Sequence, residues 1–92
     1  MAANAPRSIR MTVVTPGTPV QGFGVDGHLF TLIGHPDNTG TVYVGDQNSV
    51  ALNGYPLTTD GNQIILQVEK NLSELWFDAD TGGDIACVIR ND

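Results

Sequence analysis

The fold of this chain is decided by Gly40–Arg90, which reads GTVYVGDQNSVALNGYPLTTDGNQIILQVEKNLSELWFDADTGGDIACVIR. Short apolar runs recur in this stretch at regular intervals. They are separated by Gly, Asn and Asp, a pattern typical of antiparallel strands joined by tight turns. The expected inward face of these strands carries the following side chains: Val42, Val44, Ile64, Leu66, Val68, Leu75, Phe77, Ile85, Cys87 and Ile89.

The residues before this stretch extend the same pattern. Ser8–Val14 alternates between apolar and polar side chains, so we expect a half-buried strand that ends at the Pro-rich turn Thr15–Pro19. The Gly-rich segment Val20–Asp26 fits either a short edge strand or a loop. His28–Ile33 is apolar on both sides and predicts a buried strand.

Together these segments predict an all-β fold of about six to eight short strands linked by hairpins. We expect an antiparallel β-sandwich or jelly-roll-like barrel. The chain has 92 residues, so we expect one domain over residues 8–92, preceded by a flexible N-terminal arm at residues 1–7.

Charge and composition argue against several classes of partner. The net charge is -6, and the four basic residues do not form the cluster that a nucleic-acid backbone or an anionic membrane needs. No apolar run is long enough to span a bilayer, and the N-terminus has no signal-peptide core. We therefore expect a soluble protein made in a reducing cytoplasm, with no cofactor.

Candidate chemical motifs have simpler structural explanations. Gly22–Gly27 matches G-x-G-x-x-G, but strand-like residues follow it where a dinucleotide site needs a helix. Asp78–Asp84 resembles a calcium loop yet lacks the closing carboxylate, so we expect a turn and no metal site. Cys87 is expected to be a buried thiol, because nothing in the sequence places His28 or His35 beside it. We predict that the protein is not an enzyme.

Apolar side chains also occupy positions that the alternation assigns to solvent. If the expected inward faces form the core, then Tyr43, Ile65, Trp76 and Val88 lie outside it. Several such residues on neighbouring strands favour an interface between subunits. The alternatives are that some strands are buried on both faces, or that the assignment of faces is inverted.

Part of the chain resembles small virion proteins of tailed bacteriophages. The matching residues are the VYVG strand at Val42–Gly45, the turn Gly54–Leu57, the apolar strand QIILQV, and LWFDADTGGDIACVI, where the family pattern is LYVDADTAGDKVCV. The resemblance covers Thr39–Arg90, and the N-terminal segment shows no matching pattern.

The resemblance implies a head decoration (cement) protein that binds the outer capsid surface and stabilises the shell. It implies a symmetric oligomer, expected to be a homotrimer, with the major capsid protein as its partner. Arg7 and Arg10 are candidates for contact with a neighbouring subunit or an acidic shell surface. Two alternatives remain: a neck, tail or fibre component of the same fold, and a carbohydrate-binding module that uses Tyr43 or Trp76.

Overall fold

The computed structural model describes residues 7–47 and 54–91. This part of the chain contains eight strands and one 3₁₀ turn, so the predicted all-β class is confirmed. The strands are β1 (Arg7–Val13), β2 (Val20–Gln21), β3 (Leu29–Gly34), β4 (Val42–Gly45), β5 (Tyr55–Leu57), β6 (Gln63–Gln67), β7 (Trp76–Ala79) and β8 (Asp84–Arg90), and the 3₁₀ turn η1 spans Leu72–Glu74. No helix in the described ranges is long and apolar enough to cross a membrane.

Two predicted segments fall partly or wholly outside this description. The sequence at Ser49–Leu52 fits a short strand or an extended segment, and it lies outside the described residues. Of the arm expected at residues 1–7, only Arg7 is described, and it already belongs to β1, where it pairs with Arg90.

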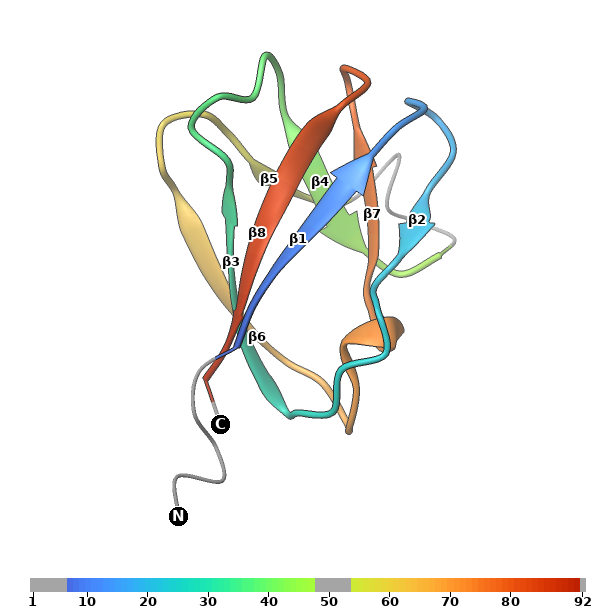
Figure 1. The fold of residues 1–92 in the computed structure, drawn as a ribbon, viewed down its shortest axis with the longest axis vertical. Helices are drawn as coiled ribbons and strands as arrows, with labels where there is room; N and C mark the ends of the chain where they lie inside the picture. Colours follow the sequence, from blue (N-terminus) through green and yellow to red (C-terminus); the bar gives the residue numbers. More distant parts are fainter. Residues whose placement is uncertain (1–6, 48–53, 92) are drawn as a thin grey trace.

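The strands form two antiparallel sheets that pack face to face (Figure 1). Sheet A has the order β1-β8-β3-β6, and sheet B has the order β2-β7-β4-β5. Pairing is nested: β1 pairs with β8, β2 with β7, β3 with β6, and β4 with β5. An eight-stranded, two-sheet arrangement with this pairing is a jelly roll.

The expectation that hairpins link the strands is mostly wrong. Among the described strands only β4 and β5 are neighbours both in sequence and in a sheet. Every other connection leads from one sheet to the other. Turn residues such as those of Thr15–Pro19 mark where a strand ends, but they do not specify which sheet the chain enters next.

The core lies between the two sheets and follows the alternation of the strands. On β1, Ile9, Met11 and Val13 point inward, as predicted, and Met11 and Val13 are fully buried. The other buried apolar side chains are Val25, Phe30, Leu32, Val42, Val44, Leu57, Leu72, Phe77, Ala79, Ala86 and Val88. Ile64, Leu66, Val68 and Leu75, which were expected to face inward, pack against this cluster while remaining partly exposed.

The connection between β6 and β7 contains a turn that strand periodicity did not predict. The Asn71 side chain accepts a hydrogen bond from the Ser73 N–H at 2.9 Å and caps η1. The Glu74 carboxylate accepts three more, from the backbone N–H groups of Glu69, Lys70 and Asn71 at 2.9, 2.8 and 2.9 Å. These bonds lower the pKa of Glu74 from its usual 4.5, with the Glu69 N–H as the largest contribution. The capped turn delays the start of β7 to Trp76.

Candidate interaction surface

The outer face of sheet A carries three of the large apolar side chains that the described part of the fold leaves exposed, those of Leu29, Ile65 and Ile89. Three positions on each of the four strands point outward, because the residues between them face the core. The outer face of sheet A is defined by these residues: Ser8, Arg10 and Thr12 on β1; Ile85, Cys87 and Ile89 on β8; Leu29, Thr31 and Ile33 on β3; and Gln63, Ile65 and Gln67 on β6.

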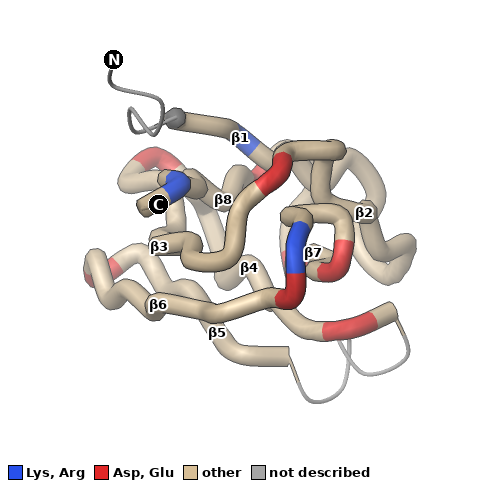
Figure 2. The backbone as a smooth tube through the Cα atoms, turned by 90° about the horizontal axis from the view of Figure 1, so that it is seen from below, with Lys and Arg blue, Asp and Glu red and all other residues tan. Residues whose placement is uncertain are grey.

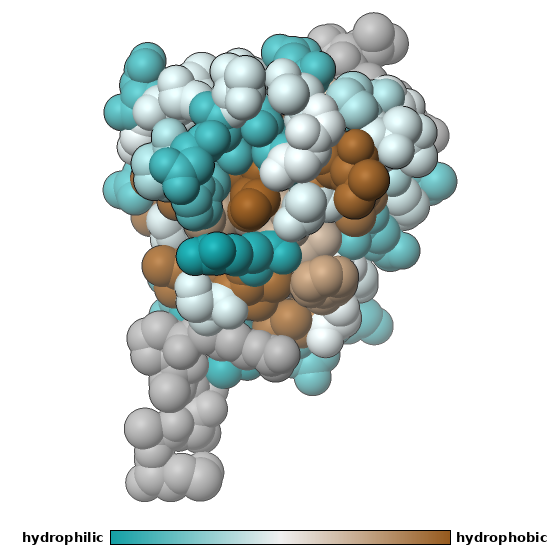
Figure 3. All heavy atoms as spheres, turned by 45° about the horizontal axis from the view of Figure 1, so that its top comes forward, coloured by the Kyte–Doolittle hydropathy of each residue, from teal (hydrophilic) through white to brown (hydrophobic). Residues whose placement is uncertain are grey.

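The strand register aligns these side chains in rows across the sheet. One row runs Ser8, Ile89, Thr31 and Ile65, and the next runs Arg10, Cys87, Ile33 and Gln63. Ile65 is 57% exposed and Ile89 is 40% exposed. Thr31 lies between them in the row, so the two exposed isoleucines are two strand spacings apart, roughly 10 Å. The space-filling view of this side shows apolar surface broken by hydrophilic side chains (Figure 3).

Charge is nearly absent from this face. Arg10 is its one charged residue, and none of the nine acidic residues within the described ranges lies on it. Figure 2 shows that β3 and β6 carry no charged residue at all. Depletion of charge together with exposed apolar side chains is the compositional signature of the centre of a protein–protein interface.

The outer face of sheet A differs from the interface that the alternation predicted. Ile65 does lie on an exposed face, as expected. Val88 does not: it is fully buried in the core. The faces of β8 were inverted, so Ile85, Cys87 and Ile89 point outward.

The reason for the inversion lies in the neighbouring strands. Inside the sandwich Val88 lies between Ile9 and Leu32, and Ala86 lies between Met11 and Gly34. The large side chains of Ile9, Met11 and Leu32 occupy the inner face beside β8, where the smaller Val88 and Ala86 pack between the strands. The larger isoleucines of β8 are therefore left on the outside.

Tyr43 and Trp76 lie on the other sheet. Both point away from the core of sheet B and are half-buried, on adjacent strands β4 and β7. Trp76 pairs with Gly45, and Tyr43 pairs with Asp78, so the two aromatic residues are diagonal neighbours. The predicted set Tyr43, Ile65, Trp76 and Val88 is thus divided among two outer faces and the core, and does not form one patch.

Hydrogen bonds hold the polar groups around Tyr43. Its hydroxyl donates to Asp80 Oδ2 at 3.1 Å. Desolvation raises the pKa of Tyr43 above its usual 10.0, and the hydrogen bond to Asp80 raises it further. The buried Asp78 accepts hydrogen bonds from the N–H groups of Gly17 at 2.9 Å and Ala79 at 2.8 Å. This carboxylate fastens the β1–β2 turn to sheet B.

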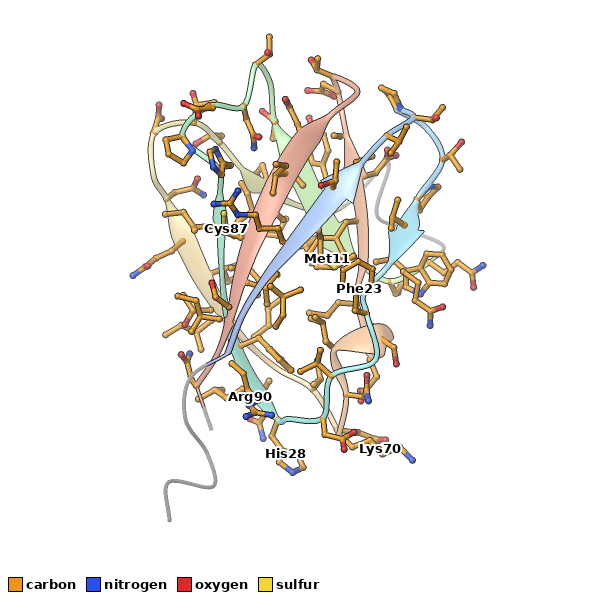
Figure 4. The ribbon with its side chains drawn as sticks, in the orientation of Figure 1. Met11, Phe23, His28, Lys70, Cys87 and Arg90 are labelled. Carbon is orange, nitrogen blue, oxygen red and sulfur yellow. The ribbon has the colours of Figure 1, made fainter. Side chains whose placement is uncertain are left out.

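The structure also places the other residues that the sequence singled out as candidates for binding or chemistry. Arg10 is exposed on the outer face of sheet A and pairs with Cys87, which is half-buried there rather than in the core. Figure 4 shows Arg90, His28 and Lys70 at the lower end of the sandwich, away from Cys87. His35 Nδ1 accepts a hydrogen bond from the Asp37 N–H at 3.0 Å. Within residues 7–47 and 54–91, no three His, Cys, Asp or Glu side chains are grouped so that they could hold a metal ion.

The two sequence motifs also have structural roles. Gly22–Gly27 connects β2 to β3, and it is fastened by hydrogen bonds from the Gly22 N–H to Leu75 O at 2.9 Å and from the Gly27 N–H to Lys70 O at 3.0 Å. At the far end of the Asp78–Asp84 turn, the buried Asp84 carboxylate accepts hydrogen bonds from the N–H groups of Thr39 and Gly40 at 3.0 and 2.8 Å. Both segments therefore join the two sheets.

Comparison with protein-family models, with curated proteins and with solved structures finds no match to this chain.

Proposed function

We propose that this protein is a structural component of tailed-bacteriophage virions, most specifically a head decoration protein. It would bind the outer surface of the capsid as a symmetric oligomer and stabilise the shell without catalysing a reaction. The observation that carries this proposal is the exposed apolar outer face of sheet A, which contains no acidic residue in a chain of net charge -6.

The fold is compatible with this role but does not select it. Jelly rolls occur in viral capsid domains, and also in lectins and cupins. The function must therefore be argued from a surface. The sequence resemblance over Thr39–Arg90 adds support for a virion protein. This stretch contains β4 to β8.

The proposed role requires binding alone. A protein that binds the assembled shell better than its free subunits stabilises the shell by mass action. When several copies are linked in an oligomer, contacts that are individually weak become lasting. The acidic residues outside the outer face of sheet A favour solubility of the free protein.

Immunogold electron microscopy tests the proposal. Antibodies raised against the purified protein would be applied to virions of the phage whose genome carries this sequence. We expect label distributed over the heads. Label confined to the neck, tail or fibres would contradict the decoration role and support a neck, tail or fibre component instead. Virions without label would contradict any virion role.

One observation favours the carbohydrate-binding alternative: the pair Tyr43 and Trp76 on sheet B, beside the Asp80 carboxylate. Trp76 is the only tryptophan in the chain, so its fluorescence reports on this face alone. Titration with oligosaccharides from the host cell surface would shift that emission if sugars stack there. An unchanged emission spectrum at millimolar sugar would exclude this alternative.

A further inference from the structure

We infer that the partner of the outer face of sheet A is a second copy of this chain, which meets it face to face about a two-fold axis parallel to the strands. This contact rests on the assembly role proposed above and specifies which surface the copies share. It is two-fold, whereas the sequence resemblance implies a trimer.

The charge distribution favours a second copy. Each copy carries a net charge of -6, so two copies repel when their acidic surfaces approach. The outer face of sheet A has no acidic residue, and it is therefore the side on which two copies can approach with least repulsion. Added salt should strengthen the contact, since it screens the net charges while leaving apolar burial intact.

The order of the strands selects the direction of the axis. A two-fold axis parallel to the strands places β8 of one copy over β3 of the other, and β1 over β6. Ile89 and Cys87 then face the β3 row of the partner copy, which is Leu29, Thr31 and Ile33. The two Arg10 side chains are kept apart by three strand spacings, about 14 Å. An axis perpendicular to the strands would instead place β1 on β1 and bring the arginines together.

The area of the face limits the strength of the contact. Four strands at a spacing of ~4.8 Å and five residues at a rise of ~3.4 Å cover about 320 Å² per copy. Two such faces bury on the order of 650 Å², below the roughly 1,200 Å² of stable interfaces. The isolated protein should therefore associate weakly and reversibly, and the contact becomes lasting where copies are held close together, as on a shell.

The only cysteine of the chain provides a geometric test, because Cys87 lies on a central strand of this face. With sheets ~10 Å apart, the two Cys87 positions are about 11 Å apart in the proposed dimer. A short bismaleimide added to the concentrated protein should join them, giving a dimer on a denaturing gel. Ile89→Glu should lower the dimer fraction about tenfold or more, because it places a carboxylate in the apolar contact.

A matched variant tests the axis. In Thr12→Cys, Cys87→Ala the thiol moves to the edge strand β1, where two copies hold it about 17 Å apart, beyond the same short reagent. We expect no cross-linked dimer for this variant. Efficient cross-linking from Thr12→Cys, or a cross-linked dimer of the parent that Ile89→Glu leaves unchanged, would overturn the two-fold contact.

Accessibility of the thiol is checked separately with a monofunctional maleimide on the native protein. If Cys87 does not react, Thr31→Cys, Cys87→Ala provides the same expected spacing from β3, and absence of a cross-linked dimer there overturns the inference. The experiment uses the isolated protein. If the immunogold label is found on the heads but the isolated protein gives no cross-linked dimer, only this contact is rejected. If the isolated protein gives a cross-linked dimer but virions carry no label, only the virion role is rejected.

Discussion

Asn38 and Ile85 exchange two hydrogen bonds across the end of sheet A. The Asn38 side-chain amide donates to the Ile85 carbonyl oxygen at 2.8 Å, and the Ile85 N–H donates to the Asn38 side-chain oxygen at 2.7 Å. The β3–β8 ladder has just ended here, at Gly34 and Ala86. The side chain thus replaces the backbone of a strand residue and holds the β3–β4 connection against β8.

Asn38→Ala should lower the free energy of unfolding by about 1–3 kcal/mol, because it leaves the part-buried Ile85 N–H without its partner. The Ile85 carbonyl oxygen still accepts the His35 N–H at 3.0 Å. Urea denaturation followed by circular dichroism measures the change. Asp37→Ala is the matched control, since the Asp37 side chain is 93% exposed, and it should change the stability by less than about 0.5 kcal/mol. Equal effects of the two substitutions would show that the Asn38 amide does not carry the connection.

The assignment of faces on β8 predicts opposite sensitivities at neighbouring positions. Val88→Ala should cost about 2–3 kcal/mol, because it removes two buried methyl groups and leaves a cavity. Ile89→Ala removes more atoms but from an exposed side chain, and should cost about 1 kcal/mol or less. Denaturant midpoints of the two variants test this order, and a larger loss at Ile89 would mean that β8 presents its other face to the core.

Gly22 and Gly24 should respond differently to the same substitution. A Cβ at Gly22 would lie 2.4 Å from the Leu72 carbonyl oxygen, whereas a Cβ at Gly24 meets nothing within 4 Å. Gly22→Ala should therefore destabilise the fold by about 1–3 kcal/mol, and Gly24→Ala should change it by less than about 0.5 kcal/mol. Thermal melts provide the comparison. Loss of stability at Gly24 but not at Gly22 would refute the close approach of these two segments.

The lowered pKa of Glu74 predicts a pH-dependent contribution to stability. Its carboxylate is ionised in the folded protein at pH values where the unfolded chain, with a pKa of 4.5, begins to bind a proton. The contribution is therefore present above pH 4.5 and is lost as the pH falls through the lowered pKa. Glu74→Gln removes it. Urea midpoints of parent and variant should differ most at about pH 6 and converge at low pH, and a constant difference would contradict this linkage.

The sequence predicted those parts of the fold in which one face of a strand is plainly polar. On β1, Ile9, Met11 and Val13 alternate with Ser8, Arg10 and Thr12, so only one orientation buries the apolar side chains. On β8 both faces are apolar, and the sequence of the strand alone does not decide between them. The choice depends on Met11, Ile9 and Leu32, which lie far away in the chain and become neighbours only after the sheet forms.

The residues that form the outer face of sheet A also depend on which face of β8 is buried. Exposure of Ile65 was correctly predicted, but its neighbours on the outer face of sheet A come from β8 and β3, which the alternation had assigned to the core or left undecided. The nested pairing of the strands could not be predicted from local sequence either, because turn residues do not determine which sheet the chain enters next. One feature of the sequence does point to the outer face of sheet A: β3, β6 and the interior of β8 contain no acidic residue.

The most direct test of the central claim, that the outer face of sheet A joins copies of this protein, is the absolute mass in solution, measured by light scattering over a wide range of concentrations. For the parent we expect the average mass to rise above the 9.8 kDa of one chain as concentration increases. Ile65→Glu and Ile89→Glu should remain folded at the mass of one chain. Phe23→Glu, an exposed residue away from this face, should behave like the parent. A parent that stays at 9.8 kDa at every concentration, or isoleucine variants that associate as the parent does, would contradict the claim.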